Sequence, residues 1–252
     1  ERNTRIYGLP IRFSNRIHPD FTDQPKYWCY ECGKIVLPTA QDTCSDCLSE
    51  NVSQYSNVEA LTPNKHYPCI CLLDPHPRKP HMLTWVQVTP NEDYEVLRTV
   101  QVEGGAQAVK DKVHEIEEEM QHNSVVRIMD PNMGRSPSGA VREVTWQDEF
   151  DGVGLRFDLA DDSGVGRARL YDFIKPDPYF KRPRFRIDVS CEDAIFQMKR
   201  YVWKDPKEQE GKDQSQEPLR VHDDFPTLFK YLMNYLPSSH AAGFSVYRRD
   251  RS

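Results

Sequence analysis

The chain has 252 residues, of which 38% are apolar and 29% charged, a balance typical of a globular protein rather than a disordered one. No apolar run approaches the ~20 residues that a membrane-spanning helix needs, so we expect no membrane partner. The net charge of -6 gives no support to nucleic-acid binding by overall charge. The opening residues, ERNTRIYGLP, lack a methionine and an apolar signal core, so we expect an excised or processed chain in the cytosol.

Four of the seven cysteines form two C-x-x-C pairs, Cys29 with Cys32 and Cys44 with Cys47. Each pair makes a tight turn that brings two thiolates to one ion, and four thiolates close a tetrahedral site typical of structural zinc. Gly33 supplies the left-handed backbone that such a turn needs. Two disulfides, disfavoured in the cytosol, or an iron–sulfur centre are the alternatives. The spacing favours a zinc ribbon that stabilises a short segment, with docking of DNA or a partner as the alternative role.

Beyond the cysteines, hydrophobic periodicity predicts a run of strands and helices. Residues 69–73, 81–90 and 94–102 predict an antiparallel meander, and apolar spacings of three and four predict a helix over 106–120. The later runs predict, in chain order, a strand at 124–131, a short strand within 154–164, a helix at 165–176, a strand with one solvent face at 184–190, and a closing helix at 225–236. This order predicts a mixed sheet with helices packed on it.

Carboxylates end two of the predicted strands and begin the last helix. Asp74 ends the first strand and Asp130 ends the fourth, and Asp223 or Asp224 lies at the helix start. If the two strands are parallel neighbours, both carboxylates emerge at one edge of the sheet, where ligand sites occur. Three clustered carboxylates require a cation between them, and oxygen ligands select Mg2+ or Mn2+. Each Asp has a structural alternative, as a turn residue or as a helix N-cap.

Basic side chains follow the first of these carboxylates. The Pro-rich segment PHPRKP predicts a stiff loop that places Arg78 and Lys79 beside phosphates, unless it is simply a solvated surface loop. His76 and His81 are candidates for orienting water or a ligand. A second basic segment, KPDPYFKRPRFR, makes Lys181 and Arg182 further candidates for DNA contact.

Several of these segments, taken in order, carry a resemblance to a known family. CICLLDPHPRKPHMLTWVQV, VVRIMDPNMGR, RPRFRIDVSCEDAIFQMKRYVWKD and VHDDFPTLFKYL resemble the nuclease domain of tailed-bacteriophage large terminase subunits. RIYGLPIRFSNRIHPDF resembles the segment that leaves the ATPase domain of that family. The resemblance covers residues 1–21 and about 67–237. Thr227 stands where the family often has its second Asp, and Asp224 where it often has His.

The resemblance implies a ribonuclease H-like fold and a metal-dependent endonuclease that cuts double-stranded DNA during genome packaging in the host cytoplasm. Asp74, Asp130 and Asp223 would hold the metals, with Asp224 as the substitute third ligand and helix cap. The implied partners are DNA, the terminase ATPase domain and the capsid portal. No G-x-x-x-x-G-K-[ST] loop occurs, so we expect no packaging ATPase in this chain.

We expect four units: a connecting segment (1–26), the zinc ribbon and linker (27–66), the nuclease domain (67–237) and a C-terminal tail (238–252). Two other functions remain open at this stage. One is a non-catalytic zinc-ribbon module on a degenerate nuclease scaffold, and the other is a ribonuclease H-like recombinase or resolvase.

Overall fold

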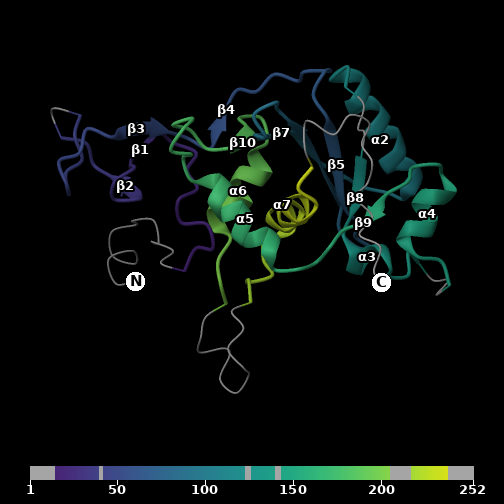
Figure 1. Ribbon diagram of the computed structural model, residues 1–252. Helices are drawn as coiled ribbons and strands as arrows, with labels where there is room; N and C mark the ends of the chain where they lie inside the picture. Colours follow the sequence, from purple (N-terminus) through teal and green to yellow (C-terminus); the bar gives the residue numbers. More distant parts are fainter. Residues whose placement is uncertain (1–14, 40–41, 123–125, 140–142, 205–216, 238–252) are drawn as a thin grey trace, which may run out of the picture.

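A seven-stranded mixed sheet with helices on both faces forms the main body of the protein (Figure 1). The computed structural model describes residues 15–39, 42–122, 126–139, 143–204 and 217–237. The strand order is β4-β10-β7-β6-β5-β8-β9, and only β6 among these described strands runs antiparallel to its neighbours. The strands are β4 (Val58–Glu59), β5 (Cys69–Asp74), β6 (His81–Val88), β7 (Tyr94–Val102), β8 (Val126–Met129), β9 (Asp158–Leu159) and β10 (Phe185–Asp188).

The first three long strands of the sheet form the predicted meander. β5 pairs with β6 from Cys69 opposite Gln87 to Asp74 opposite Met82, and β6 pairs with β7 along its whole length. All residues of β5 and β6 are buried, because helices cover this part of the sheet on both faces. The chain then passes through α2 and returns as β8, which lies parallel to β5. This crossover confirms the mixed sheet that the sequence predicts.

Two hydrophobic cores lie on opposite faces of the sheet. One face packs against α2 (Ala106–Glu119) and α4 (Trp146–Gly152), and the other packs against α5 (Val165–Ile174), α6 (Glu192–Arg200) and α7 (Asp224–Tyr235). Strand alternation divides β5 between them: Cys69, Cys71 and Leu73 face α2, whereas Ile70 and Leu72 face α7. A short helix, α3 (Pro131–Gly134), follows β8 directly.

A separate three-stranded antiparallel sheet carries the four cysteines. It consists of β1 (Lys26–Cys29), β2 (Lys34–Val36) and β3 (Val52–Tyr55), in the order β2-β1-β3. The main body holds it through the segment around Lys181, whose Nζ lies 3.8 Å from the ring centroid of Tyr30 and 2.7 Å from Oδ1 of Asn51. The predicted class, a mixed α/β sheet flanked by helices plus a small ribbon, is therefore confirmed.

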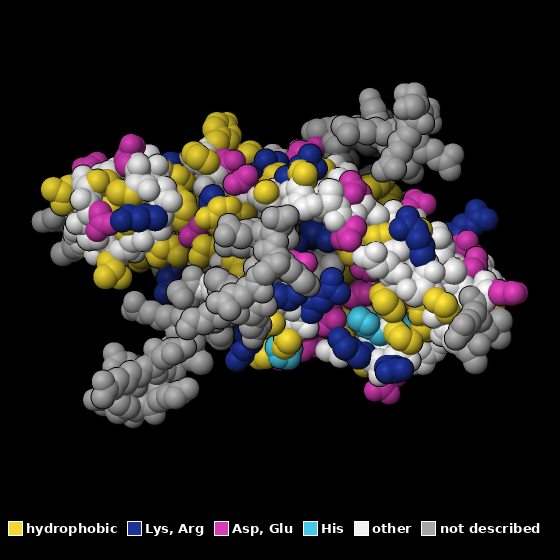
Figure 2. All heavy atoms as spheres, turned by 90° about the horizontal axis from the view of Figure 1, so that it is seen from below, with side chains coloured by type: hydrophobic (Ala, Val, Ile, Leu, Met, Phe, Trp, Pro, Cys, Tyr) yellow, Lys and Arg dark blue, Asp and Glu magenta, His cyan; other side chains and the backbone are white. Residues whose placement is uncertain are grey.

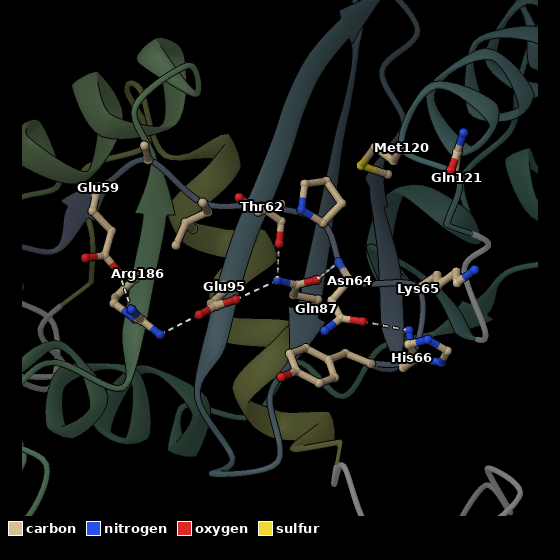
Figure 3. Close-up of a pocket in the computed structure, with 14 residues that line it drawn as sticks. Glu59, Thr62, Asn64, Lys65, His66, Gln87, Glu95, Met120, Gln121 and Arg186 are labelled. Carbon is tan, nitrogen blue, oxygen red and sulfur yellow. Dashed lines mark hydrogen bonds and ion pairs between the residues drawn. The ribbon is translucent and has the colours of Figure 1, made fainter.

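The chain between the ribbon and the seven-stranded sheet crosses one face of the larger sheet. It first adds β4 as an edge strand beside β10, and residues 60–67 then pass over β10, β7 and β6. Beneath it, Arg186 pairs with Glu59 and Glu95, and Gln87 joins Glu95 to the backbone of Thr62 and Asn64 (Figure 3). The prediction that β10 has one solvent face was wrong, because this crossing segment buries Arg186.

An open cavity of about 620 Å³ lies along the crossing segment (Figure 3). Both ends of the Gln87 amide form hydrogen bonds at this cavity. The nitrogen donates to Thr62 and Glu95, and the oxygen accepts from the backbone N–H of Asn64. The polar groups at its floor therefore fasten the segment to the sheet.

In the described part of the chain, no helix combines the length and the apolar character needed to cross a bilayer. The predicted C-terminal tail (238–252) lies outside the described residues, as do the first 14 residues of the predicted connecting segment.

Candidate metal centre

Asp74 and Asp130 end two neighbouring parallel strands. Leu73 of β5 lies opposite Met129 of β8, and the backbone N–H of Asp130 donates to the carbonyl of Leu73 at 2.9 Å. Each aspartate is the next residue along its strand, so both carboxylates emerge at the same edge of the sheet. This is the edge at which open α/β sheets bind ligands.

The start of α7 brings Asp224 to the same place. Nε2 of His76 lies 3.2 Å from Oδ2 of Asp74 and 3.3 Å from Oδ1 of Asp224. One ligand atom from each of the three residues lies within 4.8 Å of the others. The cluster therefore joins the end of β5, the loop after it and the first turn of α7.

A side chain from α6 holds the start of α7 in place. Oε1 of Gln197 accepts a hydrogen bond from the backbone N–H of Phe225 at 2.8 Å, and its Nε2 donates to Oδ2 of Asp224 at 3.4 Å. Asp223 is the N-cap residue of α7, but its side chain makes no capping hydrogen bond. Gln197 thus satisfies a backbone donor at the helix start and leaves the Asp224 carboxylate turned toward His76.

The electrostatics of the cluster are those of carboxylates crowded around one cation. Burial raises the pKa of Asp74 above its usual value, and the charges of Asp130 and Asp224 raise it further. Contacts with Asp224 and Asp74 raise the pKa of His76 to about 9, so this side chain is an imidazolium at neutral pH. The His76 contact and Lys79 hold the pKa of Asp224 below its usual value. The positive ring of His76 occupies a position that suits a bound metal cation.

The loop after Asp74 is fixed by His81 at the start of β6. Nδ1 of His81 accepts from the backbone N–H of His76 at 3.1 Å, so its Nε2 carries the proton that bonds the carbonyl of Gly104 at 2.9 Å. The ring packs edge-on against Trp146, with centroids 4.8 Å apart. His81 is therefore a neutral, buried residue that shapes the loop.

The basic residues of this loop remain accessible. Arg78 and Lys79 are exposed, and Nζ of Lys79 lies 3.4 Å from Oδ1 of Asp224. Figure 2 looks from below onto the edge where α3 begins, and acidic side chains there lie close to Lys, Arg and His side chains. This edge therefore presents cations next to its carboxylates.

The other two predicted DNA-contact residues lie before β10, at the opposite edge of the sheet. Lys181 contacts Tyr30 and Asn51 of the ribbon, and Nη2 of Arg182 donates to Oδ2 of the buried Asp93 at 2.6 Å. The structure does not bring these two side chains to the carboxylate cluster.

The four cysteines of the ribbon form a second cluster. Their sulfur atoms lie within 4.8 Å of one another, with Sγ–Sγ distances of 3.6 Å for Cys29 and Cys47 and 3.8 Å for Cys32 and Cys44. A tetrahedron with zinc–sulfur bonds of about 2.3 Å has edges of about 3.8 Å, which fits these distances, whereas a disulfide requires about 2.05 Å. All four are free cysteines. The cluster is therefore consistent with zinc.

The backbone around the cysteines has the expected tight turns. Gly33 has φ of +61°, and its N–H donates to the carbonyl of Cys29. Leu48 occupies the equivalent position after Cys47, also with φ of +61° and a bond to the carbonyl of Cys44. Gly33 fulfils the role predicted for it, and the second turn forms without a glycine.

Sequence reasoning assigned no role to four residues around the carboxylate edge. Tyr231 donates to Oδ2 of Asp130, Lys230 pairs with Asp162, and Gln197 holds Asp224. Asp130 follows β8 directly and Asp162 comes shortly after β9, so an acidic residue after a third strand was the available signal. The other three lie within helices, where only their spacing from Asp224 and their burial could have marked them.

No protein-family model and no curated protein matches the sequence. Solved structures do resemble it. The large terminase of a thermophilic bacteriophage superposes with a TM-score of 0.54 at 13% identity, over 71% of this chain and 42% of that one. The nuclease domain of the P22 large terminase superposes with a TM-score of 0.50 at 13% identity, over 70% of this chain and 84% of that domain.

This chain therefore spans less than half the length of the thermophilic phage terminase, but most of the length of an isolated terminase nuclease domain. At these identities the likeness establishes the fold alone. The chain has the fold of the nuclease domain of large terminases.

Proposed function

We propose that this protein is a divalent-metal-dependent endonuclease that cuts double-stranded DNA. The observation that carries the proposal is the convergence of Asp74, His76 and Asp224 within 4.8 Å, beside Asp130 on the neighbouring strand. The resemblance of the fold to terminase nuclease domains supports the same function.

The donor set fits a hard divalent cation. Asp74, Asp130 and Asp224 would supply carboxylate oxygens, the ligands that Mg2+ and Mn2+ prefer. The sequence predicts Asp223 as the third ligand, and this residue lies one position before α7. Burial and the neighbouring charge of Asp224 raise the pKa of Asp223, so it is also a destabilised carboxylate near this edge. We assign the third position to Asp224 because its carboxylate oxygen lies beside a carboxylate oxygen of Asp74 and a ring nitrogen of His76.

A bound Mg2+ or Mn2+ would activate water and stabilise the leaving oxygen of the phosphodiester. The chain's own groups would hold the substrate around it. Arg78 and Lys79, both exposed on the loop after Asp74, would bind the DNA backbone phosphates. Lys181 and Arg182 stay predicted DNA contacts, although they lie away from the carboxylate cluster.

We further propose that the four-cysteine ribbon binds one structural zinc, because four thiolates leave no open position for water. The proposed setting is bacteriophage genome packaging in the host cytoplasm, with the terminase ATPase domain and the capsid portal as partners.

A plasmid-cleavage assay tests the proposed function. The protein should nick and linearise supercoiled DNA with Mn2+ or Mg2+ but not with EDTA, and Asp74→Asn should be inactive with unchanged circular dichroism. Asp172→Asn is a matched control, because Asp172 is an exposed carboxylate on α5, with Oδ1 3.6 Å from Nζ of Lys175 and remote from the cluster. Metal-independent cleavage, or full activity of Asp74→Asn, would refute the proposal. A fully folded wild type without activity would favour the non-catalytic alternative.

A further inference from the structure

Both oxygens of Asp130 are held by hydrogen bonds from different elements. Oδ1 accepts from the backbone N–H of Asn132 at 2.8 Å and of Met133 at 2.7 Å, which caps the start of α3. Oδ2 accepts from the hydroxyl of Tyr231 on α7. Asp130 therefore has a fixed orientation, and a helix remote in sequence determines the position of one of its oxygens.

The same helix carries Asp224 at its start. Asp224 and Tyr231 are seven positions apart, which is about two turns, so they lie on one face of α7 about 10 Å apart along its axis. Gln197 holds the start of the helix through Phe225, and Tyr231 joins the helix to Asp130. α7 thus acts as a rigid spacer between the carboxylate of Asp224 and that of Asp130.

A second set of contacts fixes Tyr231 itself. Its side chain is 2% exposed, and Nζ of Lys230 lies 4.4 Å from its ring centroid. Lys230 also pairs with Asp162, and Nδ2 of Asn132 donates to Oδ2 of Asp162 at 3.1 Å. The contacts form a closed ring from Asp130 through Asn132, Asp162 and Lys230 to Tyr231. Neither the hydroxyl nor the carboxylate can turn without breaking it.

We propose that Tyr231 is a positioning residue for the metal site: its hydroxyl orients Asp130 so that a free lone pair of the carboxylate is directed to the cation. This role rests on the proposed function. The hydroxyl of Tyr231 donates to Oδ2 of Asp130 from a buried position, so the geometry of this bond fixes the orientation of the carboxylate. Residues that orient a metal ligand in this way typically change metal affinity by about 10–100-fold when removed.

The test compares two tyrosines that each lose one buried hydroxyl. Tyr231→Phe removes the bond to Asp130, whereas Tyr94→Phe removes a bond to the carbonyl of Pro237 at 2.9 Å, outside the metal site. Mn2+ binding is measured by isothermal titration calorimetry, and thermal unfolding verifies that both variants are folded. We expect Tyr231→Phe to raise the Kd for Mn2+ by about 10-fold or more, and Tyr94→Phe to leave it unchanged.

A double-mutant cycle with Asp130→Asn separates positioning from a general structural role. In the Asp130→Asn background, the further change Tyr231→Phe should no longer alter the Kd for Mn2+, because the carboxylate that it orients is gone. Equal Mn2+ affinity in Tyr231→Phe and wild type would overturn the positioning role alone, as would equal effects of Tyr231→Phe with and without Asp130. A wild type that binds no Mn2+ would instead overturn the proposed function, and the role of Tyr231 with it.

Discussion

Asp74 and Asp224, which lie far apart in the sequence, both have a carboxylate oxygen within 3.3 Å of the same nitrogen of His76. One carboxylate ends a central strand and the other begins the last described helix. The two carboxylates approach each other because α7 packs against β5, with the N-terminus of the helix at the carboxyl end of the strand. It concentrates negative charge at one point on the sheet edge, with Asp130 alongside.

The two consecutive aspartates at the start of α7 should have different effects on cleavage. Asp224→Asn should abolish DNA cleavage, because its carboxylate lies with that of Asp74 and the ring of His76. Asp223→Asn should retain most of the activity, because its side chain lies outside that cluster and, unlike Asp130, it does not follow a strand that is paired with the strand of Asp74. The measurement is the initial rate of plasmid linearisation at saturating Mn2+. An inactive Asp223→Asn beside an active Asp224→Asn would show that the third ligand is Asp223.

The ribbon should contain one zinc that depends on its four cysteines. Protein purified without added metal should hold about one equivalent by elemental analysis, and Cys47→Ser should fall below half an equivalent. Cys191→Ser is the matched control, because Cys191 is buried in the main core and should leave the zinc content unchanged. Wild-type protein without zinc or iron would refute the metal site.

His18 should make the protein sensitive to acid. Its ring is completely buried, and no group in the described part of the chain hydrogen-bonds either ring nitrogen. Burial, with Arg167 and Arg16 nearby, lowers its pKa to about 3. Below pH 6.5 the unfolded chain binds a proton that the folded chain cannot, so stability should fall by up to about 1.4 kcal/mol per pH unit between pH 6.5 and 3.

His18→Phe removes this titration and can keep the ring contacts with Tyr171 and Tyr201. Urea unfolding measured from pH 7 to pH 4 should show that the free energy of unfolding of the variant rises relative to that of the wild type as the pH falls. It should also be more stable at pH 7, because two unpaired buried nitrogens cost about 1 kcal/mol or more. Parallel pH profiles for the two proteins would contradict the account of His18.

Gly166 should be required for the packing of α5 against α7. A Cβ at this position would lie far inside van der Waals contact with the backbone oxygen of Lys230, so Gly166→Ala must push the helices apart. The expected loss is about 2 kcal/mol or more in the free energy of unfolding. Gly164→Ala is the control, because a Cβ there meets nothing within 4 Å. Similar unfolding free energies for the two variants would exclude this close helix contact.

The sequence is informative about features that depend on local pattern. Alternation in 81–90 predicts β6, and the two runs that end in Asp-Pro predict the carboxyl ends of β5 and β8, which the structure places side by side. The paired C-x-x-C spacing predicts the cysteine cluster, because each pair closes locally. These features need few contacts between residues that are distant in sequence.

Other features depend on distant contacts that no local pattern reveals. β4 joins the seven-stranded sheet from a segment that reads as a polar linker, and Arg186 is buried because that segment crosses it. His76 lies between two carboxylates only because α7 begins beside the loop. Tyr231 reads as a core residue of an amphipathic helix, and only its partner Asp130 gives it a further role.

The central claim is that Asp74, Asp130 and Asp224 form one divalent-metal site. The most direct test is a crystal soaked in Mn2+, with anomalous scattering used to locate the ions. We predict an anomalous peak between the carboxylates of Asp74 and Asp224, with the ring of His76 displaced from its present position or bound to the ion. The absence of an anomalous peak at these carboxylates in a crystal saturated with Mn2+ would contradict the account.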